Sequence, residues 1–253
     1  MKQAILEIES LRKYYGRQEN QTKALDGISF TVMPGEYLGI MGASGSGKST
    51  LLNCIATVIR PTAGHILMDG VEVSALKGSK LADYRGKEIG YLFQNFELLD
   101  NLTGQENILL PLGIHGVTEK EGNKRLRELA EYLEITGVMN KFPSQMSGGQ
   151  KQRVAAARAL ILNPQIILAD EPTENARVLM EKLAGLNRMQ QTTILMVTHD
   201  SNAASYCSRI LFIQDGVIFH ELRRKVPNET REQFYERILA VMAQLGGGSA
   251  NVL

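Results

Sequence analysis

The chain has 253 residues, 43% of them hydrophobic, which is enough for one globular domain or for one domain with a subdomain. Its 28 Lys and Arg residues nearly balance its 27 Asp and Glu residues, so charge gives no reason to expect binding to nucleic acid or to anionic lipid. No apolar run approaches the roughly 20 residues of a membrane-spanning helix, and the first residues do not have the pattern of a signal peptide, so we expect a cytosolic chain.

The first third of the chain predicts short strands around one helix. Alternating or continuous apolar residues predict three strands, at 4–8, 28–32 and 36–41. A polar loop from about Lys13 separates the first two, and a helix after the third ends by Arg60. Asp69-Gly70 between the apolar runs 64–68 and 71–73 predicts a β-hairpin. Cys54 and Cys207 lie among apolar or small residues and are expected to be buried thiols.

The loop after the third strand fits the phosphate-binding pattern G-x-x-x-x-G-K-[ST], the P-loop. Its residues are Gly42, Ala43, Ser44, Gly45, Ser46, Gly47, Lys48, Ser49 and Thr50. Glycines let the backbone approach a phosphate closely, and the N–H groups at a helix start favour its negative charge. Lys48 would reach the β- and γ-phosphates, and the Ser49 hydroxyl would bind Mg²⁺. The alternative, a Gly/Ser-rich surface turn, is disfavoured because strand, lysine and helix are in register.

Residues from about 95 to 164 have a helical pattern, which predicts a helical subdomain inserted into the α/β core. Within it, residues 121–134 combine an apolar face with charges spaced for i,i+4 pairs, which is typical of a surface helix. A second helix begins with Ser147, Gly148, Gly149 and Gln150. Glycines and a hydroxyl at a helix start form a second anion site. Because it is far from the P-loop in sequence, its use requires a γ-phosphate presented by another chain.

Two further motifs follow apolar strands. Residues 165–169 run into Asp170 and Glu171. A strand-terminal Asp is the expected Mg²⁺ ligand opposite a P-loop, and a carboxylate beside it can act as general base. Such residues are often only caps, but the spacing to the P-loop fits a Walker B strand. His199 follows the strand 193–197 and would lie at the carboxyl edge of the sheet, where α/β sites form, although a lone His is usually structural.

The last part of the chain predicts a helix at 177–188, a hairpin around Asp215-Gly216 and a final helix. Thr230 and Gln233 form the capping box of that helix. Its apolar stripe consists of Phe234, Ile238, Val241, Met242 and Leu245. We expect the stripe to pack on the body or on a partner protein, in preference to a membrane, because the opposite face is not enriched in basic residues. The run Gly246 to Ser249 is expected to end the helix and to be flexible.

With these motifs in this order, the chain resembles the nucleotide-binding subunit of an ATP-binding cassette (ABC) transporter over about residues 4–222. The resemblance implies an α/β P-loop NTPase core, a mixed sheet with an antiparallel β subdomain, and the inserted α-helical subdomain. It divides the chain into an ATPase domain, 1–222, and a C-terminal helix with a flexible tail, 223–253.

The resemblance also implies that two copies close head to tail around two ATP molecules, each site combining one chain's P-loop with the other's Ser147 to Gln150. It assigns Gln94 to Mg²⁺ and the attacking water, Glu171 to the general base and His199 to the γ-phosphate. It assigns adenine stacking to Tyr15, with the adjacent Tyr14 as the alternative. Met146 replaces a more usual leucine, an exchange that conserves volume.

One departure from the family pattern concerns the D-loop, a segment that spans the dimer interface. Asp170-Glu171-Pro172-Thr173 is followed directly by Glu174-Asn175-Ala176, and the expected Gly and Leu-Asp-Ser are missing. Either the deletion is real, or the sequence has lost a short loop and is numbered continuously across the gap; we favour the second. A real deletion should impair hydrolysis that depends on the dimer.

A narrower resemblance rests on the stretches 95–103, 106–112 and 198–209 and on the extra C-terminal helix. They look like the Bce-type exporters that confer resistance to antimicrobial peptides such as bacitracin. MacB-like and lipoprotein-release ATPases share the core motifs. The Bce-type resemblance implies an integral membrane permease that holds the chain at the inner face of the membrane, and a sensor histidine kinase reached through that permease.

Other classes of protein remain as alternatives. An ABC ATPase that regulates a cell-envelope complex without transport is one. A translation or DNA-repair ABC ATPase is disfavoured, because the chain has one cassette, no long coiled-coil insertion and no basic tract. A P-loop GTPase is disfavoured further, because no Asn-Lys-x-Asp motif is present.

Overall fold

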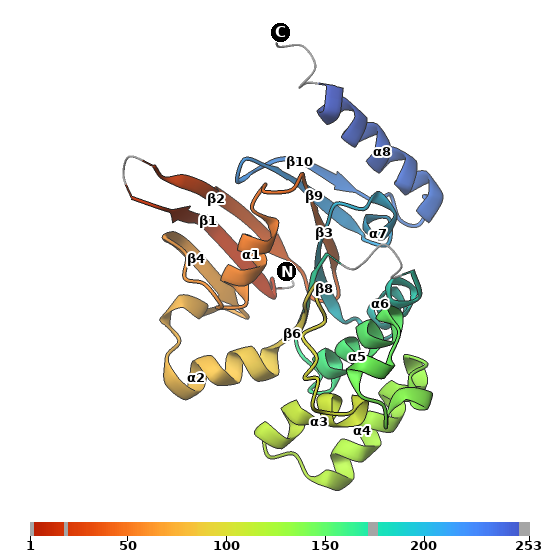
Figure 1. Cartoon of the computed structure of the whole chain (residues 1–253). Helices are drawn as coiled ribbons and strands as arrows, with labels where there is room; N and C mark the ends of the chain where they lie inside the picture. The colour runs from red at the N-terminus through yellow and green to blue at the C-terminus, as the bar shows by residue number, and fades with distance from the viewer. Residues whose placement is uncertain (1–2, 18–19, 172–176, 248–253) are drawn as a thin grey trace.

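The computed structural model of the chain describes residues 3–17, 20–171 and 177–247 (Figure 1). The strands are β1 Leu6–Tyr15, β2 Thr22–Val32, β3 Tyr37–Met41, β4 Ala63–Met68, β5 Val71–Glu72, β6 Ile89–Leu92, β7 Ile166–Asp170, β8 Thr193–Thr198, β9 Arg209–Gln214 and β10 Val217–Arg223. The α-helices are α1 Lys48–Ile55, α2 Gly78–Asp83, α3 Gly104–Ile114, α4 Glu119–Tyr132, α5 Gly148–Leu160, α6 Arg177–Gln190, α7 Ser201–Ala204 and α8 Arg231–Gly247. Short helical turns lie at Val73–Ala75, Tyr84–Glu88, Thr136–Val138 and Pro143–Gln145.

The larger sheet is mixed, with the strand order β10-β9-β3-β8-β7-β6. Strands β6, β7, β8, β3 and β9 run parallel, and β10 pairs with β9 antiparallel. The last residues of neighbouring strands pair closely, Met41 with Thr198 and Asp170 with Val197. The loops that follow β3, β6, β7 and β8 therefore meet at one edge of the sheet, as the sequence predicted for an α/β core.

Both faces of this sheet are buried, which explains the continuous apolar runs in its strands. In β8, Ile194 and Met196 point into a core built with the helices α3 to α8. Leu195 and Val197 point into a second core, which the sheet forms with α1 and the smaller sheet. Alternate residues of one strand thus serve two cores.

The smaller sheet is antiparallel, in the order β2-β1-β4-β5. The hairpin predicted at Asp69-Gly70 is confirmed, with φ angles of 47° and 75° at these two residues. The polar loop predicted from Lys13 is wrong, because β1 continues to Tyr15, which pairs with Thr22 of β2. Backbone pairing supports this end of the ribbon, and its polar side chains suit a position in water.

The first helix was expected to end by Arg60, and it ends at Ile55. Thr57 takes a left-handed backbone conformation, with φ 59°, and this turns the chain before Arg60. Cys54 and Cys207 are buried free thiols, as predicted. Burial raises the pKa of the Cys54 thiol to about 11, so this side chain is inert at neutral pH.

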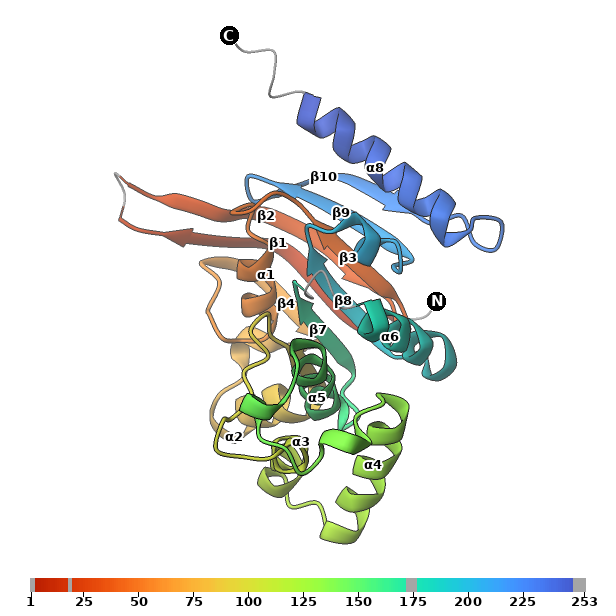
Figure 2. The same ribbon diagram turned by 45° about the vertical axis from the view of Figure 1, so that its right-hand side comes forward.

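The described elements between β6 and β7 are all helical, and α3 and α4 lie at the opposite end of the molecule from α8 (Figures 1 and 2). The capping box of α8 is confirmed: Gln233 N–H donates to Thr230 Oγ1 at 3.2 Å, and Thr230 N–H donates to Gln233 Oε1 at 3.0 Å. The helix extends through Gly247, into the run that was expected to end it; Gly248 and Ser249 lie outside the described residues. In the described part of the chain, no helix combines the length and the apolar character needed to cross a membrane.

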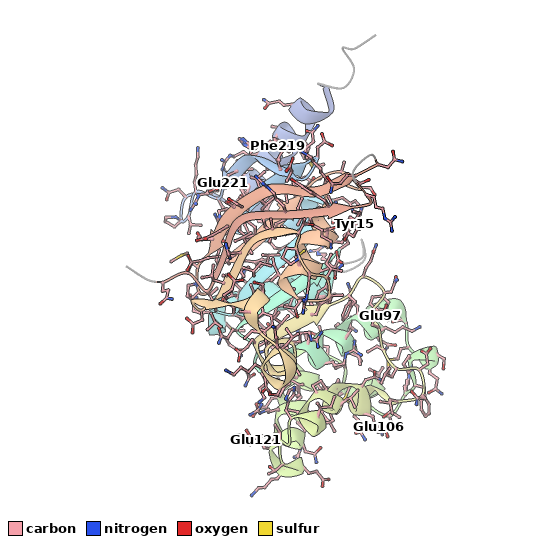
Figure 3. All side chains as sticks on the ribbon, turned by 90° about the vertical axis from the view of Figure 1, so that its left-hand side faces the viewer. Tyr15, Glu97, Glu106, Glu121, Phe219 and Glu221 are labelled. Carbon is pink, nitrogen blue, oxygen red and sulfur yellow. The ribbon has the colours of Figure 1, made fainter. Side chains whose placement is uncertain are left out.

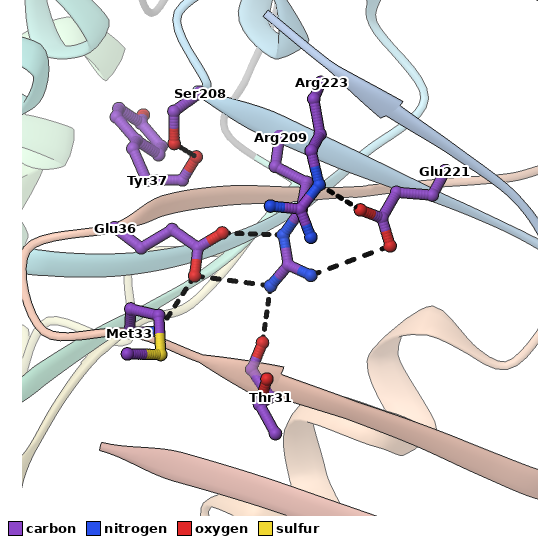
Figure 4. A network of polar contacts seen from close by, with 8 residues as sticks. All are labelled: Thr31, Met33, Glu36, Tyr37, Ser208, Arg209, Glu221 and Arg223. Carbon is purple, nitrogen blue, oxygen red and sulfur yellow. Dashed lines mark hydrogen bonds and ion pairs between the residues drawn. The ribbon is translucent and has the colours of Figure 1, made fainter. Parts of the chain in front are cut away.

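One buried arginine joins the two sheets (Figure 4). Arg209 of β9 donates from Nε to Glu36 Oε1 at 2.6 Å, and its Nη2 donates to the Thr31 carbonyl of β2. Its Nη1 lies 3.7 Å from Glu221 Oε2 of β10. The Arg209 side chain is only 8% exposed, so the ion pair with Glu36 is largely shielded from water.

We expect Arg209→Ala to lower the free energy of unfolding by about 3–5 kcal/mol, because it leaves Glu36 buried without its charge partner. Urea denaturation of the nucleotide-free chain measures this change. Arg223→Ala is the matched control, since Arg223 is 69% exposed and pairs with Glu221 at 2.5 Å. An exposed pair contributes about 1 kcal/mol or less. Equal, small losses in both variants would contradict the role given to Arg209.

Candidate active site

The P-loop joins β3 to α1 and is shaped by its neighbours. Gly47, with φ 102°, precedes the first helical residue, Lys48. A Cβ atom at Gly47 would lie 2.2 Å from the carbonyl oxygen of Ala24, and one at Gly42 would lie 2.2 Å from that of Ile213. Two glycines of the motif are therefore required by packing against β2 and β9, which fixes the loop in one shape before any ligand binds.

Lys48 reaches back across this loop. Its side chain is 4% exposed, and its ammonium group donates to the carbonyl oxygens of Gly42 and Ala43, both at 2.9 Å. The same nitrogen lies 3.6 Å from Glu171 Oε1. A positive charge is thus held between the P-loop and the carboxylate at the end of β7.

Asp170 and Ser49 face each other across the same edge. The Ser49 hydroxyl donates to Asp170 Oδ1 at 3.0 Å, and the Tyr91 hydroxyl lies 3.4 Å from Oδ2. Burial raises the pKa of Asp170, and the nearby Glu171 charge adds to this, while the hydrogen bonds from Ser49 and Tyr91 oppose it. A cation at this place would hold the carboxylate in its charged form.

These oxygens suit Mg²⁺, which prefers hard oxygen ligands and keeps several waters or phosphate oxygens. Among residues 3–17, 20–171 and 177–247, no group of three or more His, Cys, Asp or Glu side chains could hold a metal ion. The Ser49 hydroxyl and the Asp170 carboxylate fit a magnesium ion that is brought in with a phosphate ligand, and the Gln94 amide oxygen is the third ligand that the sequence predicted.

The Glu171 side chain contacts two other predicted site residues, Gln94 and His199. Gln94 Nε2 donates to Glu171 Oε2 at 3.4 Å, and His199 Nδ1 lies 3.5 Å from Oε1. The Glu171 backbone has a φ of 41° and its N–H donates to the Val197 carbonyl at 3.0 Å. The structure thus brings together Gln94, Glu171 and His199, which are far apart in sequence.

The Ser147 motif lies at the start of α5 and forms a capping box. Gln150 N–H donates to Ser147 Oγ at 3.3 Å, and Ser147 N–H donates to Gln150 Oε1 at 2.9 Å. Gly148 and Gly149 form the first turn between them. Within the described part of the chain, no hydrogen bond or ion pair joins these residues to the P-loop. The S-x-x-Q spacing could have predicted this capping box, which the sequence analysis did not consider.

The structure distinguishes the two adjacent tyrosines. The Tyr14 hydroxyl donates to Asp26 Oδ1, and this hydrogen bond raises the pKa of Tyr14. Tyr15 is 43% exposed and lies at the end of β1, on the antiparallel sheet and away from Glu106 and Glu121 of the helical end (Figure 3). Lys13 Nζ lies 5.0 Å from its ring centre. Tyr15 is therefore the ring with a surface available for stacking.

Two residues near the site were missed by the sequence analysis. Tyr91 stacks on Phe93, with ring centres 4.1 Å apart, next to Asp170. Arg158 of α5 donates to the carbonyl oxygens of Phe96 at 2.9 Å and Glu97 at 2.6 Å, and so holds the loop after Gln94. The signal for Arg158 was a charged residue on an otherwise apolar helix face.

The missing D-loop concerns residues 172–176, which lie outside the described residues. Glu171 itself lies in the described part of the chain, and its contacts with Lys48 and His199 do not involve residues 172–176.

Comparison with known proteins agrees with this arrangement. The family model described as "ABC transporter" matches residues 25–174. The chain is 45% identical over 249 residues to the bacitracin export ATP-binding protein BceA of Halalkalibacterium halodurans, covering 96% of this chain and 98% of that protein. It is 39% identical over 218 residues to the lipoprotein-releasing system ATP-binding protein LolD of Geobacter metallireducens, covering 84% and 97%.

A solved structure gives the same result for the fold. The dimeric post-hydrolysis state of the ATP-binding cassette MJ0796, bound to ADP and Pi, superposes with a TM-score of 0.79 at 37% identity, covering 86% of this chain and 98% of that one. The predicted P-loop NTPase fold and the use of ATP with Mg²⁺ are thereby confirmed. The chain belongs to the ABC transporter family, as an ATP-binding subunit that hydrolyses ATP.

Proposed function

We propose that the chain powers a membrane permease that exports antimicrobial peptides of the bacitracin type or dislodges them from their target. The observation that carries this proposal is the similarity to the bacitracin export protein, which extends over nearly the full length of both chains. The permease would hold the chain at the inner face of the membrane, and would contact the helical region after Gln94. A sensor histidine kinase would be reached through the permease.

In the proposed site, Lys48 and the P-loop N–H groups bind the β- and γ-phosphates. Glu171 is the general base: it accepts a hydrogen bond from Gln94, so a water held by Gln94 can pass its proton to this carboxylate. His199, whose Nδ1 lies 3.5 Å from Glu171 Oε1, would contact the γ-phosphate. Mg²⁺ bound by Ser49, Gln94 and Asp170 would neutralise phosphate charge in the transition state.

The proposed site is completed by a second copy of the chain. Ser147, Gly148 and Gly149 begin a helix whose free N–H groups can bind an anion, and they do not bond to the P-loop of their own chain. We therefore assign them, with Gln150, to the γ-phosphate of the partner copy, in a head-to-tail dimer. Tyr15 would stack on the adenine. The ATPase domain would comprise residues 1–222, with the helical subdomain at about 95–164, followed by the C-terminal segment 223–253.

A second candidate function is supported by the similarity to the lipoprotein-releasing protein. In that case the same ATPase would drive a lipoprotein-release or macrolide-type complex, or would regulate a cell-envelope complex without transport. The peptide-resistance proposal is preferred because the bacitracin relative is more identical and spans more of this chain.

The test is the ATPase rate of the purified chain as a function of its concentration, with Glu171→Gln as the blank. We expect the rate per chain to rise with concentration, because each site needs two chains and a working D-loop. No turnover at any concentration, despite ATP binding, would mean a real D-loop deletion or a strict need for the permease. Adding the permease separates these two cases.

With the permease present, bacitracin should change the turnover. A response to lipoprotein and none to bacitracin would favour the second candidate function. A response to neither, with normal basal turnover, would favour the regulatory role.

A further inference from the structure

The C-terminal helix α8 packs on α7, the short helix that follows His199. Phe234 and Ile238 of α8 are fully buried, and they share one core with Ala203 and Ala204 of α7. In both views α8 lies beside α7, on the side of the sheet away from β1 and β4 (Figures 1 and 2). The helix is therefore part of the body of the protein where it begins.

Polar contacts between α8 and residues 201–206 reinforce this packing. Arg231 Nη1 donates to Asn202 Oδ1 at 3.3 Å. The Arg231 guanidinium also lies over the Tyr206 ring, 4.6 Å from its centre, a favourable cation–π geometry. The Ser201 hydroxyl lies 3.0 Å from the sulfur of Met242, which is about three turns further along α8 than Arg231. Arg231 thus contacts one residue of α7, Asn202, and one residue shortly after it, Tyr206.

The start of α8 is itself fixed in place. Arg237 donates from Nη1 to both carboxylate oxygens of Glu229, at 2.7 and 2.9 Å. The same carboxylate accepts a hydrogen bond from Lys225 N–H at 2.7 Å, and Glu229 is only 9% exposed. These contacts hold the start of α8 in place, and the shared core connects it to α7.

Helix α7 sets the position of the residue before it. The Asp200 side chain accepts hydrogen bonds from the N–H groups of Asn202, at 2.8 Å, and Ala203, at 3.2 Å. His199 is the next residue towards the sheet, and its side chain is 60% exposed, with Nδ1 3.5 Å from Glu171. Its side chain has little packing of its own, so its orientation depends on the backbone between β8 and α7.

We propose that α8 is a brace that positions His199 for the γ-phosphate, and that Arg231 is the positioning residue through which it acts. This inference rests on the proposed role of His199. Arg231 contacts Asn202, Tyr206 and the neighbouring Glu232, and in this proposal it acts through Asn202, Tyr206 and the turn at Asp200. The brace therefore affects recognition of the γ-phosphate and leaves the binding of adenine and of the α- and β-phosphates alone.

The test compares the affinities of the full chain for a non-hydrolysable ATP analogue and for ADP, both with Mg²⁺. Arg231→Ala should weaken binding of the analogue about three- to tenfold, the scale of substitutions that act on a site from a distance, and leave ADP binding unchanged. Glu236→Ala is the matched control, because Glu236 is exposed on the same helix. Equal losses for the analogue and ADP would mean general destabilisation and would overturn the proposal, as would no loss for either.

A double-mutant cycle separates this inference from the proposed function. His199→Ala alone should weaken the analogue and spare ADP, and adding Arg231→Ala should cause little further loss. If the two losses add in full, Arg231 does not act through His199 and the proposal is overturned. If His199→Ala has no effect on the preference for the analogue, the role assigned to His199 is wrong. The proposed role of α8 depends on it and is then refuted as well. If His199→Ala changes the preference for the analogue and Arg231→Ala does not, the proposed function is retained and only the role of α8 is refuted.

Discussion

Lys48→Ala is expected to lower the affinity for ATP about 10²–10³-fold. In the structure the Lys48 ammonium is buried and already lies at the P-loop, between the carbonyl oxygens of Gly42 and Ala43 and the Glu171 carboxylate. Removing one partner of a buried charged contact costs about 2–5 kcal/mol, and phosphate recognition here depends on that charge. Isothermal titration calorimetry of the chain with ATP and Mg²⁺ measures the loss of affinity.

The matched control is Lys182→Ala. Lys182 also pairs with a glutamate, Glu134 at 2.7 Å, but it lies on α6, outside the site. Its loss should leave ATP affinity unchanged. Since Lys48→Ala also leaves two carbonyl groups without a partner, urea denaturation should confirm that the variant is folded under the titration conditions. Unchanged ATP affinity in a folded Lys48→Ala chain would refute the P-loop assignment.

Glu171→Gln is expected to keep ATP binding and to cut turnover about 10²–10⁴-fold, the usual scale for loss of a general base. The amide has the shape of the carboxylate, so it can still contact Gln94, but it cannot accept a proton from water. The measurement is the single-turnover rate at saturating ATP, with the affinity determined in parallel.

Glu181→Gln provides the same chemical change at an exposed position, where Glu181 pairs with Arg177 of the same helix. It should have no effect on turnover. If Glu171→Gln lowers turnover by less than about tenfold, another group acts as the general base. A large loss of ATP affinity in that variant would instead show that Glu171 acts in binding, for example by orienting Lys48.

Together, these two variants divide the site into its binding and its chemical parts. Lys48 belongs to the first and Glu171 to the second, although their side chains lie only 3.6 Å apart. The brace variant, Arg231→Ala, belongs to a third class, because it is expected to change the preference between two nucleotides and not the ability to bind one.

The sequence alone was sufficient for the parts of the site that are continuous in the chain. The P-loop, the pair Asp170 and Glu171 and the start of α5 each combine a backbone requirement with a chemical group within a few residues. The same holds for the hairpin at Asp69-Gly70, where a left-handed turn is a property of two adjacent residues. Local patterns of this kind survive in any tertiary context, so they could be predicted.

The sequence was misleading where strand pairing replaced local preference. The end of β1 looked like a polar loop, but pairing with β2 extends it to Tyr15. By contrast, the first helix was expected to end by Arg60 and does so, at Ile55, with a left-handed residue at Thr57 after it. The contacts that extend β1 are made with β2, which a short window of sequence around Lys13 does not contain.

Only the tertiary structure decided which residues meet. Gln94, Glu171 and His199 come together because three parallel strands end at one edge of the sheet, which no spacing along the chain specifies. Tyr14 is tied to Asp26 while Tyr15 stays exposed, a choice set by the pairing of β1 with β2. The docking of α8 on α7 has the same origin: the stripe on α8 predicted a buried face, but its burial against the segment that carries His199 follows from the three-dimensional path of the chain. The chemical group that each residue carries can be read from the sequence, whereas the distance between two groups depends on the whole fold.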